Sequence, residues 1–155
     1  MKPFLHIIFA FPFLLVTVNM SGCSDGRLKT EHVSGIITLD RVPLADASVV
    51  FGPKVPGQGA VGSGRTDKTG EYIIQTPHGR PGAGTLSGEY TVTVQKYKPV
   101  PTGRMLTDPD TGEVTEETIG VLIFPEVYTN ASTTPFSATV VKGRNRFDFD
   151  VKSQP

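Results

Sequence analysis

The sequence is poor in residues on which disulfide-stabilised domains, sugar-stacking sites and nucleic-acid-binding surfaces depend. Tryptophan is absent, and Cys23 is the only cysteine among the 155 residues. A single cysteine cannot form an internal disulfide, and without tryptophan no indole ring can stack on a sugar. The 15 basic residues are balanced by 15 acidic ones, and no stretch is strongly basic. We therefore predict no nucleic-acid partner.

Patterns typical of helices and of common catalytic sites are also missing. After residue 22, apolar residues do not recur every three to four positions, and strands do not alternate with helices. There is no Gly-x-Ser-x-Gly motif, no phosphate-binding loop and no Cys–His pairing. We therefore predict no catalytic residue, no cofactor and no metal site.

Residues 1–22 have the features of a targeting segment. Lys2 supplies a positive charge, residues 4–18 are nearly all apolar, and Ser21 and Gly22 precede Cys23. The apolar run is too short for a stable membrane span and matches a secretory signal peptide. Its end resembles a bacterial lipobox, with Met20 where leucine is usual. The resemblance implies a signal peptide over 1–22 and a lipidated Cys23 that carries more than one acyl chain such as palmitate.

The residues after Cys23 bear on where the protein resides. Residues 23–31 are short and polar, and we expect a flexible tether. Ser24 directly follows the cysteine, which in the bacterial sorting rule that this resembles favours the outer membrane. The prediction is a lipid-anchored protein of the bacterial cell envelope, at the outer membrane and facing the periplasm or the exterior. The alternatives for Cys23 are an ordinary signal-peptidase site or a buried thiol.

A tight turn from Asp67 to Gly70 is the clearest local signal in the mature chain. An aspartate side chain accepts a hydrogen bond from the backbone two residues on, and glycine suits the last position of a type I turn. Asp67 as a metal ligand or catalytic acid is the alternative interpretation. Strand 88–96 follows, with Tyr90, Val92 and Val94 on one face, as in a half-buried antiparallel strand.

Short strands separated by turns cover the rest of the chain. Within the first strand, Gly35 indicates a close backbone approach or a bulge. The pattern predicts an all-β, seven-stranded antiparallel sandwich over residues 32–152. The expected strands are His32–Leu39, 47–52, 60–65, 71–76, 88–96, one with Phe136, Ala138 and Val140 facing inward, and one with Phe147, Phe149 and Val151 facing inward.

Three connections complete the prediction. Residues 97–120 contain three prolines and five acidic residues, and we expect a long, irregular loop. Residues 121–128 are expected to return to the sheet, bent by Pro125. Residues 142–145 are expected to form a hairpin turn between the last two strands.

The strand motifs resemble the carboxypeptidase regulatory-like, transthyretin-like domains. The similarity rests on Val33-x-Gly35-x-Ile37, on Pro43-Leu44-x-x-Ala47-x-Val49-x-Phe51, on Thr66-Asp67-x-x-Gly70-x-Tyr72 and on Gly88-x-Tyr90-x-Val92. Pro125-x-x-Tyr128 with Phe147-x-Phe149 is similar to small bacterial lipoproteins built on this module. The resemblance implies a β-sandwich that serves as a non-catalytic accessory domain.

Related folds include enzymes whose motifs this chain does not reproduce. Transthyretin-like hydrolases end in Tyr-Arg-Gly-Ser, whereas this chain ends in Val-Lys-Ser-Gln-Pro. Intradiol dioxygenases bind iron with two tyrosines and two histidines. The candidates here have no close ligand spacing: Tyr72, Tyr90, Tyr97, Tyr128, His32 and His78. Residues 108–113 resemble a calcium loop, but they miss the EF-hand positions and predict an acidic turn.

The sequence thus predicts a non-catalytic, lipid-anchored module that makes structural or protein–protein contacts in the envelope. Residues 97–120 are the expected contact surface for an unknown envelope protein. The alternative partner is a glycan, for which the candidate rings are Tyr97, Phe124 and Tyr128. A transthyretin-like-fold enzyme is a third hypothesis. Arg65 and Arg80 flank loops; we interpret them as solvated charges, and anion binding is the alternative.

Overall fold

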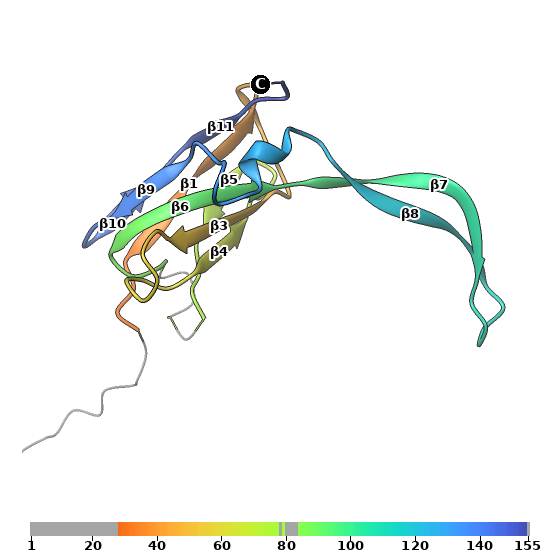
Figure 1. Ribbon diagram of the computed structural model, residues 1–155, viewed down its shortest axis with the longest axis horizontal. Coiled ribbons are helices and arrows are strands. Elements are labelled where there is room, and N and C mark those ends of the chain that lie inside the picture. Colours follow the sequence, from red (N-terminus) through yellow and green to blue (C-terminus); the bar gives the residue numbers. More distant parts are fainter. Residues whose placement is uncertain (1–27, 78, 80–83, 155) are drawn as a thin grey trace, which may run out of the picture.

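The computed structural model describes residues 28–77, 79 and 84–154, and this part of the chain is all-β (Figure 1). It contains no α-helix and no helix long and apolar enough to cross a membrane. The all-β prediction is confirmed, but the described residues form more strands than the seven expected. They are β1 His32–Leu39, β2 Val42–Pro43, β3 Ser48–Pro53, β4 Gly62–Arg65, β5 Glu71–Ile73, β6 Gly88–Gln95, β7 Tyr97–Thr107, β8 Val114–Leu122, β9 Ser137–Val140, β10 Arg144–Arg146 and β11 Phe149–Val151, with a 3-10 helix η1 at Glu126–Tyr128.

The first sheet is centred on β1 and mixes both strand directions. β5 and β2 pair with β1 in the antiparallel sense, whereas β10 and β11 pair with it in the parallel sense. The expectation of a purely antiparallel sandwich is therefore wrong for β1. The hairpin turn predicted at 142–145 is wrong too, because the chain crosses there from β9 in the other sheet to β10.

The side chain of Asn145 holds this crossing in place. Its amide nitrogen donates to the carbonyl oxygens of Val141 at 2.8 Å and of His32 at 3.2 Å, and its Oδ1 accepts from Val141 N at 2.9 Å. Asn145 is buried. The Asn145 side chain thus forms hydrogen bonds with both backbone polar groups of Val141, which in a hairpin would pair with the opposite strand.

The second sheet has the order β4-β3-β6-β9 and is antiparallel throughout. Its alternating residues face the first sheet, and the two sheets enclose one core. Phe51 of β3 lies at the centre, with its ring centroid 6.2 Å from Tyr72, 6.0 Å from Tyr90 and 6.0 Å from Phe147. The other buried apolar residues are Val33, Ile37, Leu44, Ala47, Val49, Ile74, Val92, Val94, Phe124, Tyr128, Ala138, Val140 and Val151.

Gly35 lies where another segment approaches the middle of β1. A Cβ atom on Gly35 would be 1.7 Å from the carbonyl oxygen of Phe147 and 2.9 Å from the Tyr72 hydroxyl. The Phe147 N–H donates to Ser34 O at 2.9 Å, and the Tyr72 hydroxyl donates to Phe147 O at 2.7 Å. Only glycine leaves room for this approach, as the sequence indicated.

The segment predicted as a long loop at 97–120 is instead most of a two-stranded sheet. β7 and β8 pair with each other and with no strand of the other two sheets in the described chain. They extend from the sandwich as a curved arm (Figure 1). Residues 121–128 also differ from the prediction: β8 ends at Leu122, and the 3-10 turn η1 follows instead of a strand in the sandwich.

Candidate contact surface

The turn from Asp67 to Gly70 joins β4 to β5 and uses its carboxylate as a structural acceptor. Asp67 Oδ1 accepts from Thr69 N at 2.8 Å, from Thr69 Oγ1 at 2.7 Å and from Glu71 N at 3.0 Å. Gly70 N donates to Asp67 O at 3.0 Å, and Gly70 has a φ of +78°. The hydrogen bonds from Thr69 hold the pKa of Asp67 below its usual value. A general acid needs the opposite shift.

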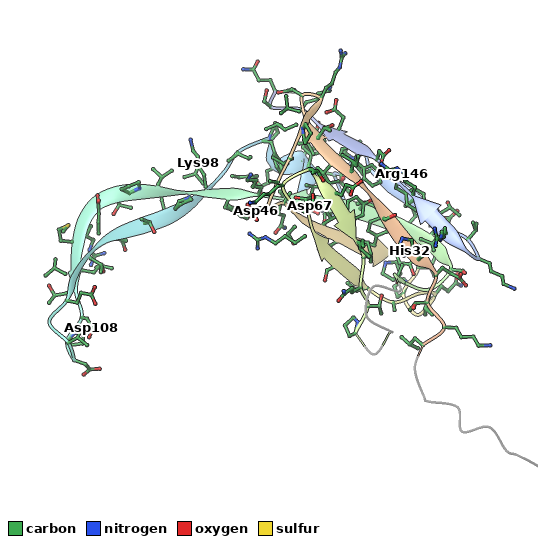
Figure 2. The ribbon with its side chains drawn as sticks, turned by 180° about the vertical axis from the view of Figure 1, so that it is seen from behind. His32, Asp46, Asp67, Lys98, Asp108 and Arg146 are labelled. Carbon is green, nitrogen blue, oxygen red and sulfur yellow. The ribbon has the colours of Figure 1, made fainter. Side chains whose placement is uncertain are left out.

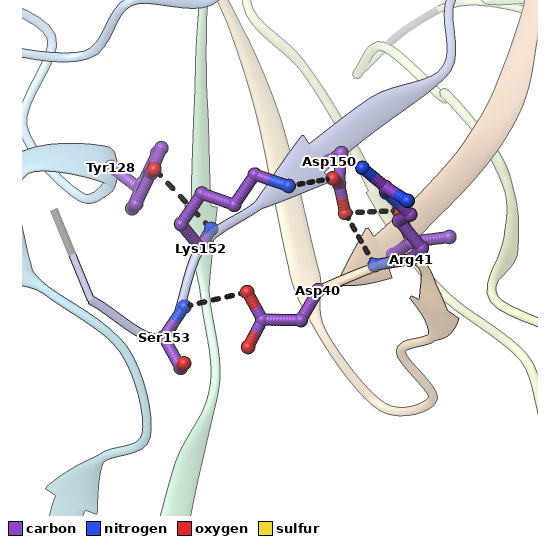
Figure 3. A network of polar contacts seen from close by, with 7 residues as sticks. Asp40, Arg41, Tyr128, Asp150, Lys152 and Ser153 are labelled. Carbon is purple, nitrogen blue, oxygen red and sulfur yellow. Dashed lines mark hydrogen bonds and ion pairs between the residues drawn. The ribbon is translucent and has the colours of Figure 1, made fainter.

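A second carboxylate, Asp150, anchors the end of β11 (Figure 3). It contacts Lys152 Nζ and accepts from Thr38 Oγ1 at 2.7 Å and from Arg41 N at 2.8 Å. These contacts, with Lys152 first, lower the pKa of Asp150 to about 2. Lys152 N in turn donates to the Tyr128 hydroxyl at 3.3 Å. The network fixes the last strand against β1 and the β1–β2 turn.

A surface groove of about 390 Å³ lies over β1 and β5. Its lining includes His32 and charged side chains of both signs: Arg65, Asp67, Glu71 and Arg146. Arg65 Nε lies 3.5 Å from Asp46 Oδ1, and Arg146 Nε lies 3.3 Å from Asp148 Oδ1. Both guanidinium groups are therefore paired with carboxylates, which reduces their attraction for an anion. Arg80 and His78 lie outside the described residues.

The tyrosines considered as iron ligands serve other purposes. Tyr72 is buried, which raises the pKa of its hydroxyl, and it donates to Phe147 O. The Tyr90 hydroxyl donates to Leu86 O at 2.8 Å. Tyr97 lies instead at the start of β7. Within the described ranges, no group of three or more His, Cys, Asp or Glu side chains is placed to hold a metal ion.

Two of the three rings considered for glycan stacking are in the core. Phe124 and Tyr128 are 5% and 7% exposed and pack edge to face, with centroids 6.0 Å apart and planes at 83°. Tyr128 also stacks on Phe136. These two candidate rings are therefore not open to a sugar, because both pack into the hydrophobic core. Tyr97 remains exposed.

The arm exposes apolar side chains on both of its faces. Because partners across a ladder point to the same side, the pairs Tyr97↔Leu122 and Val100↔Ile119 lie on opposite faces. The large apolar side chains of the arm that are exposed are Tyr97, Met105, Leu106, Val114, Ile119 and Val121. An isolated two-stranded ribbon is only marginally stable in water. The arm therefore has the character of an interaction surface that a partner completes.

The two edges of the arm differ in what they offer to another strand. Ile123 N donates to Lys96 O at 3.2 Å, so these two residues form a hydrogen-bonded pair of the ladder. Such pairs recur at every second residue, so the backbone groups of Pro99 and Pro101 point away from β8. The outer edge of β7 therefore lacks two N–H donors. On β8 the outward-directed residues include Thr118, and no proline interrupts the strand. The β8 edge is thus the one open to strand addition.

Charge is distributed unevenly along the arm, with Lys98 near its base and Asp108 at its tip (Figure 2). Lys96 directly precedes β7. The acidic residues of the arm all lie in the distal part: Asp108, Asp110, Glu113, Glu116 and Glu117. Arg104, the cation of that part, lies 3.8 Å from Glu117. The arm is therefore basic at its base and acidic toward its tip.

The tip itself is the acidic turn that residues 108–113 predict. Asp108 Oδ1 accepts from Asp110 N at 2.8 Å and from Thr111 N at 3.2 Å, and Gly112 N donates to Asp108 O at 2.8 Å. Gly112 has a φ of +72°. The backbone hydrogen bonds lower the pKa of Asp108, so the tip is anionic at neutral pH.

The sequence analysis missed strand β8 and the role of Asn145, although β8 has a pattern that could have been recognised. Residues 114–122 are rich in β-branched residues and free of proline, which is typical of a strand. Asn145 carried no such signal, because its role depends on a crossing between sheets. Cys23, the predicted lipidation site, lies outside the described residues.

Comparisons with known proteins add little. No family model and no curated protein matches the chain. Among solved structures, the chain is similar to part of a 9R-lipoxygenase from Cyanothece PCC8801, with 16% sequence identity and a TM-score of 0.37. The match covers 82% of this chain and 16% of the lipoxygenase chain. A similarity this weak carries no functional argument.

Proposed function

We propose that this chain is a non-catalytic, lipid-anchored β-sandwich of the bacterial cell envelope, of the carboxypeptidase regulatory-like, transthyretin-like kind. Its function is to make protein contacts through the β7–β8 arm. The observation that carries the proposal is the arm, which exposes apolar side chains on two faces and leaves the β8 edge unpaired. The N-terminal signal and Cys23 supply the membrane anchor.

The arrangement of the described chain is compatible with such an anchor. The described chain begins at one end of the sandwich, and the arm extends from the other side (Figure 1). Glu31, expected to belong to the tether, instead pairs with Thr85 of the folded domain. The remaining eight residues, 23–30, span at most about 28 Å when extended. An anchor at Cys23 would hold the sandwich near the bilayer and leave the arm free to reach a partner.

Lipidation is tested by metabolic labelling with a palmitate analogue. We expect the wild-type chain to be labelled and Cys23→Ala to be unlabelled, since the thiol of Cys23 is the proposed attachment site. The Cys23→Ala chain should also leave the membrane fraction. Equal label in both chains would refute the anchor.

The contact role is tested with a photo-crosslinking amino acid placed at single positions in cells. Ile119 on the arm is 52% exposed, and Val42 on the sandwich is 64% exposed, so Val42 is a matched control. We expect a defined protein adduct from position 119 and none from position 42. Adduct formation at neither position, or equally at both, would contradict a contact role for the arm.

A further inference from the structure

The open β8 edge and the uneven charge of the arm together identify a partner. We propose that the arm pairs with the arm of a second copy of this chain, β8 against β8 in the antiparallel sense, which forms a four-stranded sheet between two sandwiches. This inference rests on the proposed contact role of the arm.

The backbone groups on the two outer edges of the arm favour β8 as the paired strand. Pro99 and Pro101 deprive the outer edge of β7 of donors, whereas Thr118 directs its backbone N–H and C=O away from β7. Pairing through β8 would convert a marginal two-stranded ribbon into a sheet of four strands. The prolines then lie on the two outer edges, where they prevent further strand addition.

The residue order of β8 suits antiparallel self-pairing centred on Thr118. In this register Thr118 faces Thr118 of the second copy, and β-branched residues opposite each other are favourable pairs. Glu116 then faces Gly120, Glu117 faces Ile119, and Val114 faces Leu122 of the second copy. Every glutamate is opposite an uncharged residue. A parallel arrangement in register would instead place each glutamate beside its own copy, which is destabilising.

The charges at the two ends of the arm favour the same arrangement. Antiparallel pairing places the acidic tip of one arm, around Asp108, at the same end of the sheet as the base of the other arm, near Lys98 (Figure 2). Lys96, which directly precedes β7, lies at that base too. In this sheet the lysines at the start of one β7 and the acidic residues of the other copy's β8 are two strand spacings apart, about 10 Å, so their attraction acts at long range. These charges are exposed, so salt should weaken the association.

Cysteine scanning of the full-length chain in its membrane tests the register. Residues that face each other across an antiparallel ladder have Cα atoms about 5.5 Å apart, within the range of about 4.4–6.8 Å that a disulfide bridges. Thr118→Cys should therefore give a disulfide-linked dimer on mild oxidation. Thr115→Cys is the matched control, because two copies of residue 115 would be about 20 Å apart along the strands. The wild-type chain, in which Cys23 is the only cysteine, is a second control that measures any disulfide-linked dimer formed through Cys23.

The outcomes separate this inference from the proposed function. A dimer with Thr118→Cys at several times the yield of Thr115→Cys supports the pairing, and a twofold mass of the wild-type chain in detergent by light scattering supports it independently. Equal crosslinking at both positions, or no crosslink together with a monomeric mass, overturns it. In the second case, an adduct of the arm with a different protein at position 119 would leave the contact role standing, and absence of any adduct would remove both.

Discussion

Substituting Gly35 tests whether the approach of Phe147 to β1 holds the two halves of the fold together. The contact is between backbones: a Cβ at position 35 would lie 1.7 Å from Phe147 O. That carbonyl accepts from the Tyr72 hydroxyl at 2.7 Å, and Phe147 N donates to Ser34 O at 2.9 Å. The backbone of Phe147 therefore cannot move away from β1 without breaking one of these two hydrogen bonds.

The magnitude follows from what Gly35→Ala must displace. Real Cβ atoms essentially never lie within 3.0 Å of such an oxygen, so the two backbones have to separate by more than 1 Å. Overpacking of this kind costs about 1–3 kcal/mol. Separating Phe147 O from the buried Tyr72 hydroxyl costs about 1–3 kcal/mol more, since the hydroxyl loses its partner. We expect Gly35→Ala to lower the free energy of unfolding by about 2–6 kcal/mol.

Urea unfolding followed by circular dichroism measures this loss, with Gly52→Ala as the matched control. Gly52 also lies in a strand, but the nearest atom to its added Cβ is Thr91 O at 3.9 Å. Alanine there should leave stability unchanged or raise it by about 0.5 kcal/mol. If Gly35→Ala and Gly52→Ala unfolded at the same urea concentration, the reasoning about the crossing would be refuted.

A second variant keeps the test decisive if Gly35→Ala does not fold. Tyr72→Phe removes only the hydroxyl and leaves Phe147 O without its donor, at a cost of about 1–3 kcal/mol. Because both substitutions break the same hydrogen bond, their effects should be less than additive in a double-mutant cycle. A wild-type midpoint for Tyr72→Phe would show that the hydrogen bond contributes nothing.

Three further predictions address other parts of the structure. Asn145→Ala should cost about 2–4 kcal/mol in urea unfolding, because it leaves the Val141 backbone groups unpaired. A loss below about 0.5 kcal/mol, as for an ordinary surface substitution, would contradict this role. The pKa of Asp150 is lowered to about 2 in the folded chain, so its stabilising effect should be complete above its unfolded pKa of about 3.9 and be lost as pH falls toward 2. Asp150→Asn should reduce the change of the urea midpoint with pH between about pH 4 and pH 2. If the midpoint of the variant changed with pH as steeply as that of the wild type, the result would argue against the network. Replacing 98–121 by a short glycine-rich turn should leave the unfolding midpoint of the sandwich nearly unchanged, since no residue of that segment is buried; loss of cooperative unfolding would show that the arm is needed for folding.

The parts of the fold that the sequence predicts well are those fixed by local rules. Alternation in residues 88–96 predicted which face of β6 is buried, and Tyr90, Val92 and Val94 are indeed inside. Gly35 was predicted to mark a close backbone approach because a strand rarely tolerates glycine without reason. Such features depend on a few neighbouring residues, so a single sequence suffices to predict them.

The parallel pairing of β1 with β10 and β11 depends on a contact that no local pattern records. Residues 142–145 have the composition of a hairpin turn, and Gly143 does adopt a φ of +105°. The chain nevertheless changes sheets there, because Asn145 bonds to Val141 and also to His32, far away in the sequence. A tertiary hydrogen bond has overridden the local preference.

The arm shows how the same residues can mislead a strand prediction and yet explain the surface. Pro99 and Pro101 argued against a strand at 97–120, because proline removes ladder hydrogen bonds. In the structure their nitrogens point outward, so the ladder to β8 loses nothing and only the outer edge is blocked. The two prolines are two residues apart, and alternate residues of a strand direct their backbone groups to the same edge, so both prolines lie on the outer edge. The prolines that hid the strand from prediction therefore also select β8, centred on Thr118, as the edge left for a partner.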